Sequence, residues 1–153
     1  LGTCAIYSGT VSAATEASIE GIPAIAISLD SFENSNFKFA AKFGAKLTKI
    51  ILKNGLPDGV ALNVNIPAVP ESEVKGVSIT RQGKSRVIET FDKRVDPRKN
   101  TYYWMAGEMR FDEVDEEADC FQVSNNYISI TPIHFDLTNY STINKLKSWD
   151  ISL

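Results

Sequence analysis

An almost uninterrupted apolar run at residues 24–29 is the feature that most constrains the fold of this chain. Such a run is typical of a strand buried on both faces, as in the parallel sheets of α/β proteins. A helical pattern precedes it at residues 9–19, and a second one follows at residues 37–53. Residues 60–66 then predict another strand. This alternation of helix and strand predicts an α/β fold in which neighbouring strands are parallel.

The second half of the chain has a different character. Residues 86–95 and 101–105 predict the arms of a long hairpin around a polar turn at residues 96–100. The other expected elements are a strand at 74–80, a short acidic helix at 115–123, a strand at 127–131 stopped by Pro132, and a last helix at 139–149 with Ser141 as its N-cap. We therefore expect an α/β core over residues 1–70, a hairpin-containing region over 71–135 and a C-terminal helix over 136–153.

Composition places the chain among globular proteins of one domain. Its 153 residues are 43% hydrophobic and 23% charged, and no apolar run approaches the roughly 20 residues that span a bilayer. The net charge of −3 argues against stable binding to nucleic acid. The basic residues of segment 75–99 could steer an anionic ligand locally, but the simpler interpretation of these charges, and of the acidic ones at 108–119, is solvated hairpin faces.

The two cysteines give no sign of a metal site or a disulfide. Cys4 and Cys120 have no CxxC spacing and no neighbouring histidine, so we expect small buried hydrophobic residues and a cytoplasmic location. The chain starts at Leu1 without an initiator Met or a signal-peptide pattern. We expect this residue not to be the natural start of the gene product.

The triplet Ser8-Gly9-Thr10 stands directly before the first helical pattern. The first turn of a helix carries unpaired N–H groups and a partial positive charge, which suit a phosphate group. Ser and Thr are also ordinary N-caps. The residues alone leave both interpretations open.

The motifs in the sequence disfavour two functional classes. A serine hydrolase built on Ser8, His134 and Asp136 lacks the Gly-x-Ser-x-Gly elbow, and Asp136 is too close in sequence to orient His134 well. A dinucleotide-binding fold is disfavoured because no Gly-x-Gly-x-x-Gly follows a predicted strand.

Six segments, taken together and in this order, resemble the SurE family of stationary-phase survival proteins. They are Tyr7-Ser8-Gly9-Thr10-Val11-Ser12-Ala13-Ala14 with Gly21-Ile22-Pro23-Ala24-Ile25-Ala26, Leu62-Asn63-Val64-Asn65-Ile66-Pro67, Thr80-Arg81-Gln82-Gly83, Asp96-Pro97-Arg98, Tyr102-Tyr103-Trp104, and Ser129-Ile130-Thr131-Pro132 with Asp136-Leu137-Thr138. Each is weak alone, but the series covers nearly the whole chain.

The resemblance implies a metal-dependent phosphomonoesterase that acts on nucleoside monophosphates, a 5'-nucleotidase with 3'-nucleotidase and exopolyphosphatase as further activities. It implies a Rossmann-like, three-layer αβα core with an extended β-hairpin through which subunits form homodimers or homotetramers, here residues 86–105. It also implies that Ser8, Gly9 and Thr10 bind the phosphate group of the substrate.

The family's divalent cation, Mg or Mn, is held by an Asp-Asp pair, a Ser and an Asn that have no counterpart in this chain. The resemblance therefore implies metal ligands upstream of Leu1, and we expect the 153 residues alone to be catalytically incomplete. The alternative is a non-catalytic oligomerisation or nucleotide-binding module.

Candidate contacts to the rest of the substrate lie in the loop and hairpin segments. They are Arg81, Asp96, Arg98 and Tyr103. Aromatic rings of segment 102–104 could stack on a base, but burial at a subunit interface is the favoured interpretation for most of them.

Overall fold

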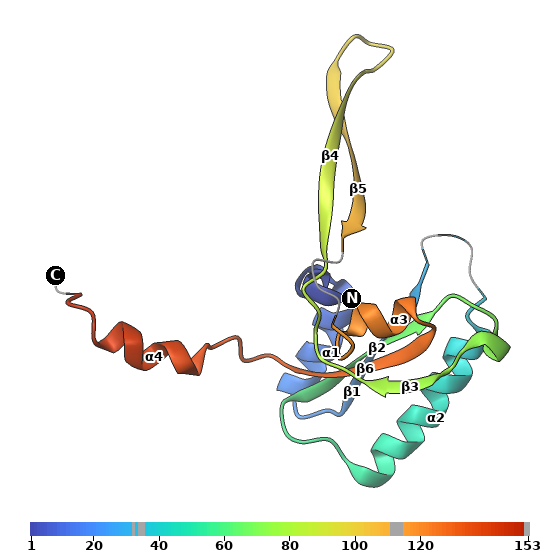
Figure 1. The fold of residues 1–153 in the computed structure, drawn as a ribbon, viewed down its shortest axis with the longest axis vertical. Helices are drawn as coiled ribbons and strands as arrows, with labels where there is room; N and C mark the ends of the chain where they lie inside the picture. Colours follow the sequence, from blue (N-terminus) through green and yellow to red (C-terminus); the bar gives the residue numbers. More distant parts are fainter. Residues whose placement is uncertain (32, 34–35, 111–114, 152–153) are drawn as a thin grey trace.

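Four strands form a mixed sheet in the computed structural model, which describes residues 1–31, 33, 36–110 and 115–151 (Figure 1). Their order is β1-β2-β6-β3. The strands are β1 (Ala24–Asp30), β2 (Val60–Pro67), β3 (Gly76–Ile79) and β6 (Tyr127–His134). β1 is parallel to β2, and β3 is parallel to β6, whereas β2 and β6 are antiparallel. The prediction of an α/β fold with a parallel first pair of strands is confirmed.

One face of the sheet is apolar and packs on the long helix α2 (Lys38–Asn54). The core there joins Leu47 and Ile51 of α2 to Val64 and Ile66 of β2, with Ile128 and Ile130 of β6 beside them. The side chains alternate along each strand, so this set shares one face. Its burial is the main hydrophobic contribution to the fold.

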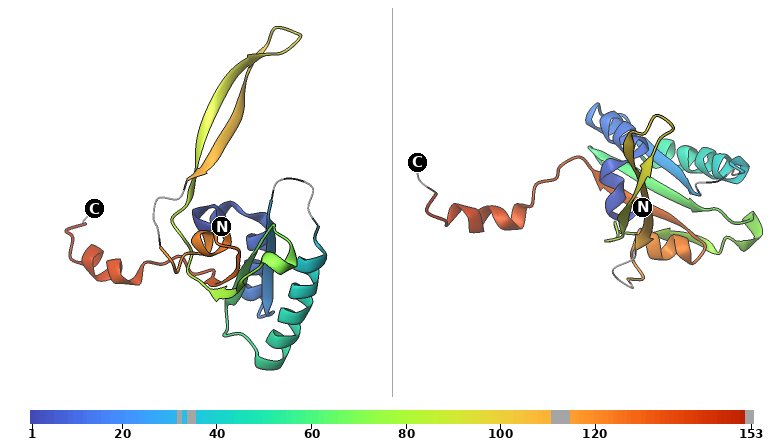
Figure 2. Two further views of the ribbon diagram at one scale, coloured as in Figure 1. Left: turned by 45° about the vertical axis from the view of Figure 1, so that its right-hand side comes forward. Right: turned by 90° about the horizontal axis from the view of Figure 1, so that it is seen from above.

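The opposite face is built from small and polar side chains and is covered by α1 (Gly9–Ile19) and α3 (Asp119–Ser124) (Figure 2). Ala14 of α1 packs on Ala24, Ala26 and Ala61, because small residues allow the helix to approach the strands closely. Further along the same face lie buried Asn63, Asn65, Ser129 and Thr131. The N-terminal 3-10 helix η1 (Gly2–Tyr7) precedes α1 and contacts α1 and the hairpin strand that begins at Arg86.

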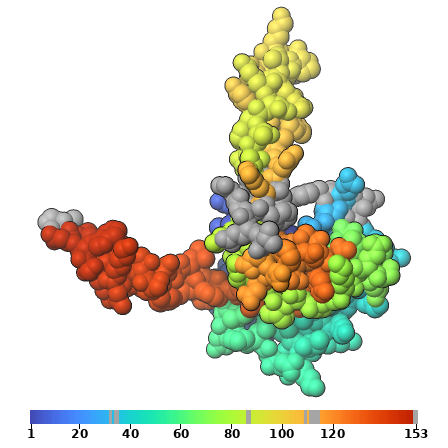
Figure 3. Space-filling model, viewed as in Figure 1, coloured from blue at the N-terminus to red at the C-terminus, as the bar shows by residue number. Residues whose placement is uncertain are grey.

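Two segments extend away from this body. The antiparallel hairpin of β4 (Arg86–Val95) and β5 (Thr101–Arg110) projects from one side, and α4 (Tyr140–Lys147) lies at the end of an extended segment (Figures 1 and 3). α4 has no buried residue. A short 3-10 turn, η2 (Glu71–Glu73), links β2 to β3.

Three sequence-based expectations about the C-terminal third are wrong. β6 does not stop at Pro132 but continues to His134, with Pro132 opposite Leu62. The N-cap of α4 is Asn139, whose side chain accepts a hydrogen bond from the Thr142 N–H at 3.1 Å, and not Ser141. The expected acidic helix is also shorter, because α3 begins only at Asp119.

Candidate functional site

Ser8 occupies the N-cap position of α1. Its Oγ accepts a hydrogen bond from the Val11 N–H at 3.3 Å, and its carbonyl accepts the Ser12 N–H at 2.9 Å. The backbone of Ser8 is extended, as an N-cap requires. A hydroxyl group both accepts and donates, so this capping bond leaves the Ser8 proton available to an external acceptor.

Gly9 and Thr10 form the first turn of α1, and both are exposed. Helix geometry leaves their N–H groups without an intrahelical acceptor. A Cβ built on Gly9 would meet no atom within 4 Å, so space lies open over this turn. The first turn contains no acidic side chain. The N-terminal end of α1 therefore presents two hydroxyls, free N–H groups and an uncompensated partial positive charge.

Arg81 follows β3 and forms an isolated parallel bridge with Ala118. Its guanidinium pairs with the carboxylate of Asp115 and donates to the Gln82 carbonyl at 3.3 Å. Thus Arg81 holds the loop after β3 to the segment before α3.

Asp96 and Arg98 lie in the turn of the β4–β5 hairpin, and Tyr103 lies on β5, with 63% of its surface exposed. The Asp96 carboxylate accepts hydrogen bonds from the Asn100 N–H at 2.7 Å and from Asn100 Nδ2 at 3.1 Å. The backbone bond from Asn100 is the main cause of a lowered pKa for Asp96. Within one chain the hairpin carries these residues away from α1, so the structure does not bring them together with Ser8 (Figure 1).

Asp119 is buried where the sequence predicts an exposed residue. The acidic character of segment 108–119 predicts solvated side chains, yet none of the surface of Asp119 is exposed. Its Oδ2 accepts the Gly2 N–H at 2.8 Å, and its Oδ1 accepts the Gly83 N–H at 2.9 Å and the Cys120 N–H at 2.8 Å. A buried carboxylate needs such donors in place of water. The local sequence carries no signal for them, because two of the three come from distant segments.

Cys120 also lies in this buried cluster, and burial raises the pKa of its thiol. Both cysteines are free; Cys120 is buried as expected, whereas Cys4 is only partly buried.

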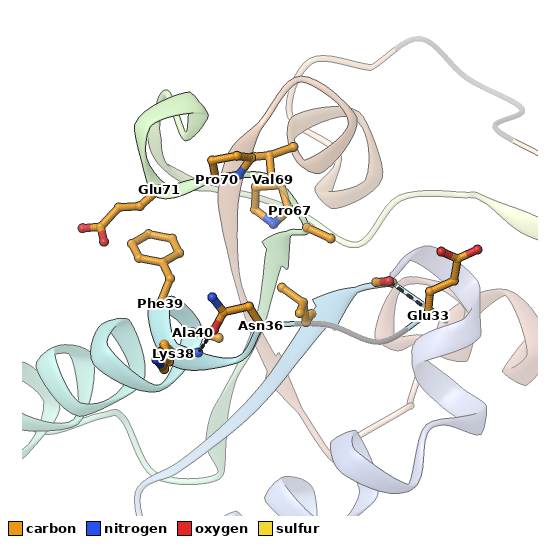
Figure 4. Close-up of a pocket in the computed structure, with 12 residues that line it drawn as sticks. Glu33, Asn36, Lys38, Phe39, Ala40, Pro67, Val69, Pro70 and Glu71 are labelled. Atoms are coloured by element: carbon orange, nitrogen blue, oxygen red, sulfur yellow. Dashed lines mark hydrogen bonds between the residues drawn. The ribbon is translucent and has the colours of Figure 1, made fainter.

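A cavity of about 600 Å³ lies at the carboxyl ends of β1 and β2 (Figure 4). Its walls come from the segments that follow the two strands and from the first turn of α2, and they include Ser31, Asn36, Phe39, Pro67 and Pro70. Asn36 Oδ1 accepts the Lys38 N–H at 3.1 Å, just before the start of α2 at the cavity wall. This edge of an open α/β sheet is where such folds bind ligands. Ser8, Gly9 and Thr10 do not line this cavity.

The described residues do not fit a divalent cation. Among them, no three His, Cys, Asp or Glu side chains converge closely enough to hold a metal ion, and a hard cation needs several oxygen ligands. Across the same ranges of the chain, no helix is long and apolar enough to cross a membrane.

Comparison with known proteins identifies relatives along the whole chain. The chain is 45% identical over 151 residues to the 5'-nucleotidase SurE of Syntrophobacter fumaroxidans, covering 99% of this chain and 60% of that protein. It is 52% identical over 153 residues to the 5'-nucleotidase SurE of a Thermoanaerobacter species, covering 100% of this chain and 60% of the relative. The chain thus spans about 60% of the length of these relatives.

A solved structure agrees with these relatives. The crystal structure of the SurE protein from Aquifex aeolicus matches with a TM-score of 0.80 at 43% identity, over 96% of this chain and 59% of that one. Residues 1–89 match the protein family described as Survival protein SurE. The chain belongs to the SurE family.

Proposed function

We propose that the intact protein is a metal-dependent phosphomonoesterase that hydrolyses nucleoside monophosphates, with Ser8, Gly9 and Thr10 binding the phosphate group. The observation that carries the proposal is the open first turn of α1, with two hydroxyls and free N–H groups over unfilled space. The relatives named 5'-nucleotidase SurE support the choice of substrate. Hydrolysis at the 3' position and of polyphosphate would use the same phosphate contacts.

The role proposed for these 153 residues is to stabilise the negative charge on the phosphoryl group. The N–H groups of Gly9 and Thr10 and the hydroxyls of Ser8 and Thr10 donate to the non-bridging oxygens of the phosphoryl group. Because these donors are fixed by the helix, they need no reorganisation as charge develops during phosphoryl transfer. The partial charge at the start of α1 favours the anion in the same position.

The cation is proposed for the intact protein only. We assign Mg or Mn to carboxylate ligands outside these 153 residues, because the described residues do not assemble a site. The 153 residues alone are then expected to show little turnover.

We further propose a Rossmann-like, three-layer core for the intact protein, a cytoplasmic location, and homodimers or homotetramers formed through the hairpin at 86–105. In such an assembly, Asp96, Arg98 and Tyr103 of one chain could approach the substrate only at a site of another chain. Arg81 is proposed to lie in a loop that contacts the substrate bound to its own chain. The second candidate function is a non-catalytic assembly or nucleotide-binding module, and the projecting hairpin is the observation that favours it.

The experiment is a phosphatase assay of the intact protein with a nucleoside monophosphate and Mg²⁺ or Mn²⁺. Ser8→Ala and Thr10→Val each remove a donor to a charged group, worth about 1.5–3 kcal/mol or roughly 10- to 150-fold in kcat/KM. Thr15→Val is the matched control, since the Thr15 hydroxyl donates to the Val11 carbonyl at 2.9 Å further along α1. The control should retain wild-type activity.

Three results would count against the proposal. Wild-type kcat/KM in both Ser8→Ala and Thr10→Val would remove the phosphate role of the triplet. Activity that persists in a chelator would remove the metal. An intact protein without hydrolysis, but with a mass that depends on the hairpin, would favour the assembly module.

A further inference from the structure

The buried carboxylate of Asp119 joins three segments that are distant in the sequence. Its oxygens bind the N–H groups of Gly2, Gly83 and Cys120 at 2.8–2.9 Å, and none of its surface is exposed. These donors come from the start of η1, from the loop after β3 and from the first turn of α3. All three partners are backbone groups, so the carboxylate fixes the path of the chain rather than a side chain.

The start of η1 is held tightly on its other sides as well. Gln82 Nε2 donates to the Gly2 carbonyl at 2.9 Å, and the Thr3 N–H donates to the Ser85 carbonyl at 3.2 Å. Gly2 has a φ of +54° and faces Ser85 so closely that a Cβ would lie 1.8 Å from its Oγ. Only glycine is compatible with both this backbone angle and this approach.

The contacts that hold Gly2 lie only one short helix away from the residues proposed to bind phosphate. η1 runs from Gly2 to Tyr7, and its last turn closes where the Ser8 N–H donates to the Ala5 carbonyl at 3.2 Å. Ser8 is both the C-cap of η1 and the N-cap of α1. With no loop between the two helices, a displacement of Gly2 moves Ser8 and the first turn of α1.

We propose that Asp119 is a positioning residue for the phosphate site: it holds η1 on residues 82–85, and η1 in turn sets where Ser8, Gly9 and Thr10 point. This inference rests on the proposed function. Since Arg86 begins β4 directly after Ser85, the same carboxylate also ties the phosphate site to the root of the hairpin.

The test uses the intact protein with Asp119→Asn. Asn keeps the shape and one acceptor oxygen, but its NH₂ group faces a backbone N–H and cannot bind it. We expect the Kd for inorganic phosphate and the KM for AMP to rise at least tenfold in the folded variant. A purely structural role would lower the fraction of folded enzyme, and hence the apparent kcat, without moving either constant.

Two further variants complete the design. Gly2→Ala disturbs the hydrogen bond between the Gly2 N–H and Asp119 without changing Asp119 itself. It should also raise the Kd for phosphate and the KM for AMP. Ser129→Ala is the matched control, because Ser129 is equally buried but contacts Thr80 on the sheet. The control should lower Tm and leave the Kd for phosphate at its wild-type value.

A wild-type Kd for phosphate in Asp119→Asn would overturn the inference. If that variant does not fold, a wild-type Kd in Gly2→Ala would overturn it equally. Failure of the proposed function gives a different result, since the wild-type intact protein would then neither bind phosphate nor hydrolyse AMP.

Discussion

Gly83 lies where the loop after β3 passes closest to α3. A Cβ at this position would come 2.7 Å from Cys120 Sγ and 2.9 Å from Asp119 Oδ1. Both atoms belong to buried residues, and close-packed interiors leave little room for a side chain to shift. Gly83→Ala should therefore destabilise the protein by about 1–3 kcal/mol, the usual cost of overpacking, measured by urea unfolding.

Gly9→Ala is the control for that measurement, because it makes the same substitution where no atom lies within 4 Å. Alanine also favours the helix, so the free energy of unfolding should be unchanged or raised by up to about 1 kcal/mol. Equal stabilities for the two alanine variants would contradict the tight packing at Gly83.

Asp136 gives a prediction about pH. A side-chain hydrogen bond from Thr138, followed by one from the Tyr140 hydroxyl, lowers the pKa of this exposed carboxyl from 3.8 to about 2. The folded arrangement thus favours the ionised form. Its stabilising effect on segment 136–140 is complete above pH 3.8 and is lost as the pH falls through about 2. A carboxyl NMR titration should give this low midpoint.

Tyr140→Phe removes one of these donors and should move the Asp136 midpoint up toward 3.8. Tyr7→Phe, at an exposed tyrosine on η1, should leave the midpoint unchanged. An Asp136 midpoint near 3.8 in the wild-type protein would show that these bonds do not persist in solution.

Residue-level prediction from the sequence succeeded where the role is local. Ser8 could be identified as a cap because capping needs only the next three residues. Asp119 could not be identified as buried, since its acidic neighbours suggested a solvated segment and its partners Gly2 and Gly83 lie 117 and 36 residues away. Burial of a charge depends on such distant donors.

At the scale of elements, periodicity predicted the strands and helices well. The helix α1 has the bounds expected from its pattern, β1 and β2 each extend one residue further, and α2 is shifted by one residue at both ends. The second arm of the hairpin was expected at 101–105, but β5 continues to Arg110. The predicted end of β6 at Pro132 was wrong because proline usually ends a strand. It is tolerated in β6 because β3 pairs only as far as Ile130, so the missing N–H faces a side where no strand continues.

The cap of α4 gives the prediction at this scale. Asn139 Oδ1 accepts hydrogen bonds from the Thr142 N–H and hydroxyl and from the Ser141 hydroxyl. Asn139→Ala should cost the helix about 1 kcal/mol, seen as faster amide exchange in α4. Because α4 buries no residue, the Tm of the body should not change.

Ser141→Ala is the matched control for the α4 cap, since the Ser141 hydroxyl donates to the capping side chain and not to the backbone of the helix. It should have a clearly smaller effect on exchange than Asn139→Ala. Equal effects, or a larger one for Ser141→Ala, would mean that the cap observed here is not the one that holds the helix.

For the whole molecule, the sequence predicted a long aromatic hairpin but not its direction. Direction depends on how β4 leaves the buried cluster at Ser85, which no local pattern encodes. The structure shows the hairpin projecting from the body (Figure 3). In its register Phe91 lies opposite Met105, and Lys93 lies opposite Tyr103. Directly opposed residues share a face, so Phe91, Tyr103 and Met105 form one side, each about 60% exposed.

An exposed face of this kind is stabilised by burial against a second chain, at about 1.5–3 kcal/mol for each large side chain fully covered. If the intact protein assembles through the hairpin, Phe91→Lys combined with Met105→Lys should lower the mass measured by light scattering. Thr90→Lys combined with Ala106→Lys places the same two charges on the opposite face, where these two residues pair, and should leave the mass unchanged. An unchanged mass in the double variant, and again after deletion of residues 86–105, would exclude the hairpin as the assembly element.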